Sequence, residues 1–301
     1  MSSTLLQLIQ QATGELGLTV PNSVAGNSST DTVQQLALLN ALGNEIQREF
    51  EWQALDKEYR LTTQYLVTTG DLSANSAVIT NLASTTGLDS TYMVTGTGIN
   101  QDTYIVSVDS ATQVTLSQAA STSGTSVSLT FGKTKYSLPS DFDRQINRTH
   151  FDKSKRWEML GPESAQQWQW LKSAYISTGP RIRYRILGGY FQIWPILSTP
   201  EYLGFEYISN GWVTSASGTP KSSFTVDTDT CIFPDRLMVL GLKMKYFEIK
   251  GFDATAFTRD FQDQLSIAKA NDAGAATLSF SPRISSVLIG WENIPDSGYG
   301  S

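Results

Sequence analysis

Apolar side chains recur at intervals of three and four along residues 31–52, which is the pattern of an amphipathic helix. The stripe consists of Leu36, Leu39, Ala41 or Leu42, Ile46 and Phe50. Thr30 or Asp31 is the predicted N-cap. Gly43 lies inside the stretch and weakens a helix by about 1 kcal/mol relative to alanine. Packing against other parts of the chain must therefore hold this helix in place.

Two further amphipathic helices are predicted near the other end of the chain, over residues 235–251 and 254–272. Their stripes are Leu237, Leu240, Met244 and Phe247 in the first, and Phe257, Phe261, Leu265 and Ala268 in the second. A shorter helix is predicted within residues 1–17, with Leu5, Leu8 and Ile9 on its buried side. Helices at both ends with strands between them predict an α+β fold, in which a terminal helix bundle carries a β-rich middle.

The composition changes abruptly between Gly70 and Gly132, because this segment contains no Lys, Arg, Glu, Pro, Trp or Cys. Short β-branched runs separated by turn residues predict five strands, at 76–84, 91–99, 103–110, 112–121 and 125–132. Around residues 109–112, alternating apolar positions are typical of a hairpin, and they are Val106, Val108, Val114 and Leu116. We therefore predict an inserted all-β domain at 70–132, a core formed by 1–69 and 133–274, and an extended C-terminal arm at 275–301.

The predicted core contains several more strands and one short helix. The strands are expected at 58–68, 181–187, 190–194, 202–208 and 230–233. The helix is expected at 163–174, where Trp168 and Trp170 are two positions apart and face different sides. At least one of these two tryptophans is expected at a contact surface or its rim, or buried against the β-rich part.

Composition and charge exclude several functional classes. Only 17% of the residues are charged and the formal net charge is −6, whereas a generic nucleic-acid-binding protein is normally basic. The single cysteine, Cys231, excludes an internal disulfide, and the single histidine, His150, excludes a poly-histidine metal site. No window approaches the roughly 20 apolar residues of a membrane span. The first residues lack the basic region of a signal peptide. We expect no cofactor, no metal site and no membrane contact.

Basic residues gather in residues 133–193, which hold eleven of the 22 lysines and arginines against five acids. Arg181, Arg183 and Arg185 alternate along one predicted strand and are expected to point to one side. Two interpretations stay open at this stage. The residues form a solvated face with local ion pairs, or they form an interface patch that meets an acidic partner or DNA phosphates.

The C-terminal arm is apolar but has no helical period, and prolines and glycines interrupt it. Its candidate anchors are Phe280, Ile284, Val287, Leu288, Ile289 and Trp291. Disordered segments usually lack such residues. We therefore expect an extended arm that lies on a neighbouring subunit or on another protein, although it could also fold back on its own subunit.

Catalytic signals are weak. His150 is the only histidine that could act as a base, and no G-x-S-x-G motif precedes a helix. A surface or strand-end histidine is the expected alternative. Gly96 and Gly98 are predicted to form a turn, and Asp227 and Asp229 lack the rest of a calcium loop. Any two acids of the chain could meet in the fold as the paired carboxylates of glycoside cleavage, so that enzyme class stays open.

Several loose motifs occur together in a characteristic order. They are a helix ending in NEIQREFEW (44–52), an LPSDF turn (138–142), the strand GYFQIWP (189–195) and FPD (233–235) at the start of a long helix. This order resembles head-to-tail adaptors of tailed bacteriophages, of the head-completion and tail tubular protein A-like types. Residues 70–132 resemble a small β module that is common in phage structural proteins.

The resemblance implies a virion structural protein without enzymatic activity and without cofactors, located in the head–tail neck and assembled in the host cytoplasm. It implies a ring of about twelve copies between the portal protein and a tail tube or nozzle protein. Genomic DNA would pass through the ring without sequence-specific contacts. In that arrangement the arm residues named above would bind the portal.

Two other functional classes stay open. A tail fibre or receptor-binding module is compatible with the Ser/Thr-rich β segment and exposed aromatic residues, although fibres usually carry repeats and few long helices. A tail-associated glycan hydrolase is the second alternative. The mass of the assembly separates an adaptor, which forms a large ring, from a fibre, which forms a trimer. Turnover of cell-wall glycan would identify a hydrolase.

Overall fold

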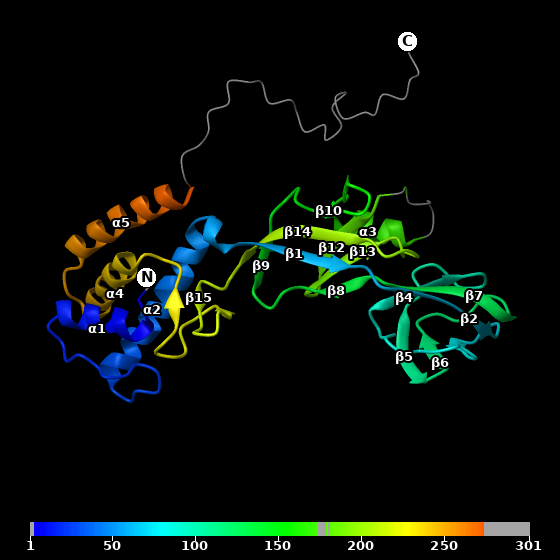
Figure 1. Cartoon of the computed structure of the whole chain (residues 1–301), viewed down its shortest axis with the longest axis horizontal. Coiled ribbons are helices and arrows are strands. Elements are labelled where there is room, and N and C mark those ends of the chain that lie inside the picture. Colours follow the sequence, from blue (N-terminus) through cyan, green and yellow to red (C-terminus); the bar gives the residue numbers. More distant parts are fainter. Residues whose placement is uncertain (1–2, 174–178, 180, 274–301) are drawn as a thin grey trace, which may run out of the picture.

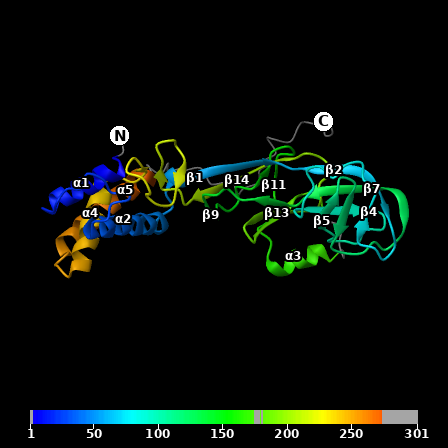
Figure 2. The ribbon, with the colours of Figure 1, turned by 90° about the horizontal axis from the view of Figure 1, so that it is seen from below.

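The computed structural model describes residues 3–173, 179 and 181–273. The chain is elongated, with helices at one end, sheets in the middle and a small β unit at the other end (Figure 1). A view turned by 90° shows the same three parts in the same order (Figure 2). The predicted α+β class, with helices from both ends of the chain packed together and strands between them, is confirmed.

The helical end contains the predicted long helices. Its elements are α1 (Leu5–Glu15), α2 (Thr30–Glu49), the short 3-10 helix η1 (Gln53–Leu55), α4 (Asp235–Lys250) and α5 (Thr255–Ala273). The N-cap of α2 is Ser29 and not Thr30 or Asp31. Helix α2 also ends before Trp52, because the indole of Trp52 folds back and donates to the carbonyl of Ile46 at 2.7 Å.

Helix α1 begins with a capping box, which satisfies backbone N–H groups of its first turn. Thr4 and Gln7 exchange hydrogen bonds between side chain and backbone, as a capping box requires. The backbone N–H of Leu5 donates to the carbonyl of Asp229 at 2.8 Å. The N-terminal helix is thereby joined to the loop that precedes α4.

A buried core joins all four long helices to aromatic residues from the segment that precedes α4. Trp212 is fully buried at its centre, and the predicted stripe residues Leu39, Leu42 and Ile46 of α2 belong to the same cluster. The ring of Trp212 packs edge-on to Phe224. Burying each large apolar side chain is worth roughly 1.5–3 kcal/mol, so this core is the main stabilising element of the helical end.

The middle of the molecule consists of small antiparallel sheets and one short helix. One five-stranded sheet contains β1 (Asp56–Thr62), β14 (Tyr202–Ser209), β10 (Phe151–Asp152), β11 (Trp157–Glu158) and β9 (Phe142–Gln145). A three-stranded sheet contains β12 (Arg183–Leu187), β13 (Tyr190–Trp194) and β8 (Lys135–Ser137). A second three-stranded sheet contains β15 (Val213–Thr214), β16 (Pro220–Lys221) and β17 (Thr230–Cys231). This sheet lies at the helical end, since Val213 and Cys231 belong to the core of the helices (Figure 1). Helix α3 spans Ala165–Lys172.

The predicted single strand at 58–68 is wrong in one respect. The chain forms two strands there, β1 up to Thr62 and β2 from Tyr65. Between them the backbone N–H of Thr63 donates to the carbonyl of Glu201 at 2.9 Å, and that of Gln64 donates to the Tyr136 hydroxyl at 3.0 Å. These bonds turn the chain out of the five-stranded sheet and into the β unit.

The β unit consists of two three-stranded antiparallel sheets. One contains β2 (Tyr65–Leu72), β7 (Gly124–Lys133) and β4 (Tyr92–Gly96), and the other contains β3 (Val78–Ile79), β6 (Gln113–Leu116) and β5 (Ile105–Ser110). Bridges between Asp71 and Thr80 and between Met93 and Tyr104 link the two sheets into a small barrel. Its buried apolar cluster is drawn from residues 72–131. All five strands predicted in this stretch are therefore present.

The predicted hairpin is also present, but its two strands differ in burial. Val114 and Leu116 are buried in the barrel, whereas Val106 and Val108 are exposed. Register shifts in β5 on either side of Ser107 and Val108 break the simple alternation, because a bulge moves the following side chains to the other face.

A small apolar joint connects the barrel to the middle sheets. Met93 of β4 packs with Trp168 and Leu171 of α3 and with Trp194 of β13, and all four side chains are buried. Trp170, in contrast, is exposed, so the two tryptophans of α3 do face different sides as predicted. The limits of the inserted domain remain our interpretation, since β2 begins before and β7 ends after residues 70–132.

Candidate functional site

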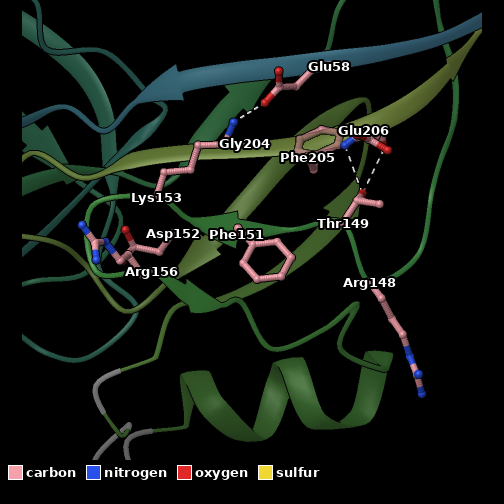
Figure 3. A pocket seen from close by; sticks show the side chains of 10 residues that line it. All are labelled: Glu58, Arg148, Thr149, Phe151, Asp152, Lys153, Arg156, Gly204, Phe205 and Glu206. Carbon is pink, nitrogen blue, oxygen red and sulfur yellow. Dashed lines mark hydrogen bonds and ion pairs between the residues drawn. The ribbon is translucent and has the colours of Figure 1, made fainter. Parts of the chain in front are cut away.

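A pocket of about 560 Å³ lies beside β10 and β14 in the five-stranded sheet (Figure 3). Its lining comes from β1, from β10 and its flanking turns, and from β14. The residues are Glu58, Arg148, Thr149, Phe151, Asp152, Lys153, Arg156, Gly204, Phe205 and Glu206. Most of its charged side chains belong to the basic segment that the sequence singled out.

Glu58 is already neutralised by cations of the same chain. Its carboxylate pairs with Arg60 on β1 and with Lys153 after β10. Hydrogen bonds from Arg60, and then from Lys153, lower the pKa of Glu58 to about 2. A carboxyl group with such a pKa stays ionised near neutral pH, so it is unsuited to act as a general acid.

Asp152 and Thr149, two other residues of the lining, bond to backbone groups. The buried Asp152 accepts hydrogen bonds from the N–H groups of Ser154 at 3.0 Å and Lys155 at 3.2 Å, which closes the turn after β10. Desolvation by burial raises the pKa of Asp152. The hydroxyl of Thr149 accepts from the N–H of Glu206 at 3.0 Å. These contacts fix the shape of the pocket and point to a structural role for both residues.

Two arginines stand on opposite sides of the Phe151 ring (Figure 3). Arg148 and Arg156 are exposed, and the structure gives neither an ion pair within the described part of the chain. Their backbone φ angles are 63° and 59°, in the left-handed region that non-glycine residues rarely occupy. Guanidinium groups suit bidentate contact with carboxylates or phosphates. The arrangement therefore suits contact with an acidic partner.

Of the two positions expected for His150, on the surface or at a strand end, the structure shows the strand end and contradicts the surface. Although it directly precedes β10, it is only 1% exposed and lies between Tyr184 and Phe205, with ring centroids 4.0 and 4.6 Å away. Neither ring nitrogen has a hydrogen-bond partner among the described residues. Burial lowers the pKa of His150 to about 4. This environment makes it a neutral core residue and gives no support to a role as a catalytic base.

We expect His150 to make the stability of the protein pH-dependent. The unfolded chain takes up a proton below its ordinary pKa of 6.5, whereas the folded chain does so only below about 4. The contribution of His150 to the free energy of unfolding is therefore complete above pH 6.5. It falls by about 3 kcal/mol as the pH drops towards 4, at about 1.4 kcal/mol per pKa unit.

The variant His150→Phe keeps the aromatic stack and removes this titration. Urea unfolding at pH 7 and pH 4.5 should show a smaller loss of stability for the variant than for the wild type. Carboxylates titrate in both proteins and cancel in the comparison. Identical losses in the two proteins would contradict the assigned burial of a neutral imidazole.

The three predicted patch arginines do not share one strand. Arg183 and Arg185 alternate on β12, while Arg181 precedes it. Arg183 forms an ion pair with the buried Glu163 at 2.6 Å, and Arg185 lies opposite Gln192 of β13. Arg181 is exposed. One member of the group therefore has a structural partner, and the patch as an interface remains a proposal.

Asp227 and Asp229, which were considered as calcium ligands, bond to other groups of the chain. Asp229 pairs with Lys221, and Asp227 accepts from the N–H groups of Val24 and Ala25, so both carboxylates are engaged by the chain itself. No group of three potential metal ligands occurs among the described residues. The six arm residues, Phe280, Ile284, Val287, Leu288, Ile289 and Trp291, lie outside the described residues.

Sequence reasoning missed the role of Asp141 in the LPSDF turn. Its carboxylate accepts from Lys57 Nζ at 2.5 Å, Ser209 Oγ at 2.7 Å and the Tyr207 hydroxyl at 2.9 Å. It thereby connects β1, β14 and the turn before β9 at the border of the helical end. The LPSDF motif could have predicted this role, because an aspartate in a turn is a common acceptor of local hydrogen bonds.

These observations define an α+β protein with a helical end, middle sheets and a barrel, in which many of the described charged groups are bonded within the chain. Residues 100–283 match the family model described as SU10 adaptor protein, and the chain therefore belongs to this family. It is a phage structural adaptor and a component of the virion, which indicates a non-enzymatic role. A search of curated proteins gave no match. Within the described part of the chain, no helix is both long and apolar enough to cross a membrane.

Proposed function

We propose that this protein is a head-to-tail adaptor of the head-completion or tail tubular protein A-like type. About twelve copies would form a ring between the portal protein and a tail tube or nozzle protein in the neck of the virion, and the ring would continue the DNA channel. The match to the SU10 adaptor family carries this proposal. The elongated chain supports it, because its helical end and its barrel can contact different proteins (Figure 1).

The charge distribution agrees with a channel component. The net charge of −6 disfavours adhesion to DNA, so genomic DNA could pass without sequence-specific contacts. The excess of basic residues in 133–193 would then serve a protein partner. Arg181 and Arg185, together with Arg148 and Arg156 at the pocket, are the exposed or half-buried arginines that we assign to this contact.

We further propose that the C-terminal segment is the portal arm, and that assembly takes place in the host cytoplasm. Its six apolar anchors would each contribute roughly 1.5–3 kcal/mol on burial. Ordering a backbone residue costs on the order of 1–2 kcal/mol, so the anchors offset this entropy only in part. Main-chain hydrogen bonds and the multivalency of a ring would supply the remainder.

Removing residues 279–301 is expected to abolish stable attachment to the portal while leaving the melting temperature of the subunit nearly unchanged. The assay is sedimentation of purified portal with the full-length or truncated chain. Attachment of the truncated chain at normal strength would show that the arm does not bind the portal. A chain that unfolds on truncation would show that the segment belongs to the core of its own subunit.

The same assay tests the basic contact. Arg181→Glu combined with Arg185→Glu should weaken assembly more at low salt than at high salt, because exposed charges are screened over about 10 Å at 0.1 M. Arg183 is left intact because it pairs with Glu163. Arg259→Glu on the helical end is the matched control, since Arg259 is exposed and, among the described residues, its one ion pair is with the adjacent Asp260. Equal effects of the control and the double variant on assembly would show that the basic residues form a solvated face and not an interface.

A further inference from the structure

A small cavity of about 160 Å³ lies where the barrel meets the middle of the molecule. It is lined by residues of the barrel, of helix α3 and of the sheet that contains β8 and β13. They are Met93, Asp102, Tyr104, Thr134, Lys135, Trp168, Lys172, Gln192, Ile193 and Trp194. We call this space the joint cavity. Binding sites occur preferentially between such parts of a chain.

Two buried donors of the joint cavity have no hydrogen-bond partner. Trp168 is 1% exposed and Trp194 is 4% exposed. The indole N–H groups of both side chains are unpaired within the described part of the protein. Buried indole N–H groups normally find an acceptor, so two such groups lining one cavity call for a specific explanation. An acceptor inside or beside the cavity would satisfy them.

The charged groups of the cavity have a net positive balance. Lys135 and Lys172 face a single carboxylate, that of Asp102. Lys172 Nζ lies at the ion-pair distance of 3.0 Å from Asp102 Oδ1, although this oxygen accepts no well-aligned hydrogen bond among the described residues. The Lys172 side chain is only 21% exposed. The ammonium group of Lys135 lies 5.4 Å from the centre of the Tyr104 ring and has no ion pair in the described residues. One ammonium charge is therefore left without a counter-charge.

We propose that the joint cavity binds a small oxyanion of phosphate or sulfate size. The unpaired ammonium of Lys135 supplies charge, and the indole N–H groups of Trp168 and Trp194 supply neutral donors. The volume of about 160 Å³ is large enough for a group of four oxygens around a central atom, since one water molecule needs only about 10–15 Å³ of such space. The site is independent of the adaptor role and of any contact with a portal or tail protein.

The expected consequence is a tighter joint between the barrel and the rest of the chain. An oxyanion would bridge Lys135 of β8 with α3, which carries Trp168 and Lys172. Charge-assisted hydrogen bonds are stronger than neutral ones, so a single anion adds appreciably to a joint whose apolar cluster has four buried members.

Indole resonances in a ¹H–¹⁵N NMR spectrum test the proposal directly. Titration with inorganic phosphate at constant ionic strength should shift the signals of Trp168 and Trp194 with a Kd of about 1 mM or tighter, and leave the other five tryptophan signals in place. Trp168→Phe and Trp194→Phe assign the two signals. Absence of any selective shift up to about 20 mM phosphate would overturn the proposal.

Two charge variants separate anion binding from a purely structural role. Lys135→Met should weaken phosphate binding about tenfold, because it removes a charge-assisted contact. Asp102→Asn removes the competing carboxylate and should tighten binding severalfold, even if it lowers stability. Lys269→Met on the helical end is the control, with unchanged binding expected. Weaker binding in Asp102→Asn, or no change in Lys135→Met, would contradict the assigned site.

Discussion

Replacing Gly43 by alanine is expected to destabilise the protein by at least about 3 kcal/mol, although alanine is the better helix former. A Cβ atom at this position of α2 would lie 2.1, 2.3 and 2.5 Å from three ring atoms of Trp212. The Trp212 ring cannot easily retreat, because it stacks on Phe233 and its N–H donates to Asn44 at 3.0 Å. Overpacking a filled core typically costs 1–3 kcal/mol, and more where backbone must shift.

Gly14→Ala provides the matched control for this prediction. Gly14 lies in α1, is exposed, and has open space where its Cβ would be. The same substitution should stabilise the protein there by about 0.5–1 kcal/mol, through helix propensity alone. Urea unfolding of both variants gives the two free energies. A Gly43→Ala protein as stable as the wild type would show that Trp212 moves without loss of packing.

Asp229→Ala is expected to destabilise the helical end by about 3–5 kcal/mol, the cost of breaking a buried ion pair. The Asp229 carboxylate is 1% exposed and accepts from Lys221 Nζ at 2.9 and 3.0 Å. It also accepts from the N–H groups of Thr225 and Val226, each at 2.9 Å. Burial alone would raise the pKa of Asp229, yet the hydrogen bonds from Thr225, Lys221 and Val226 hold it below its ordinary value.

The substitution would leave a cation and two backbone donors without their acceptor. Asp229→Asn keeps one oxygen acceptor and should fall between alanine and the wild type. Asp260→Ala on the exposed face of α5 is the control, with an expected change within about 0.5 kcal/mol. Thermal and urea unfolding measure all three. A small loss in Asp229→Ala, comparable to that of the control, would show that the loop before α4 is held by its apolar residues alone.

The long elements could be predicted because their patterns repeat over many residues. Three stripes at helical spacing gave α2, α4 and α5, and the change in composition at Gly70 gave the strands of the barrel. Periodicity does not depend on knowing the partner surface, so these predictions needed no tertiary information.

Strands β10 and β11 could not be predicted, because tertiary pairing alone defines them. Strands β10 and β11 have two residues each and show no periodicity. The break between β1 and β2 depends on hydrogen bonds to Glu201 and Tyr136, which are distant in sequence. Register shifts in β5 likewise decided which valines are exposed.

The candidate site was the least predictable part. The excess of basic residues indicated the right region, but only the fold shows that Arg183 is bound to Glu163 while Arg148 and Arg156 are exposed at a pocket. Nothing in the sequence around His150 distinguishes a buried ring from a surface one, because its neighbours in the stack, Tyr184 and Phe205, come from distant strands.

The pairing of β1 with β14 has a mechanical consequence. The two strands run along the long axis of the molecule and stay in register from Asp56 opposite Ile208 to Thr62 opposite Tyr202 (Figure 1). Their hydrogen bonds lie perpendicular to the strands. Since β1 runs directly from η1 at the helical end to β2 of the barrel, tension between these two parts is carried by its covalent backbone, which is already extended. The pairing with β14 keeps β1 straight, so the two ends of the molecule resist being pulled further apart.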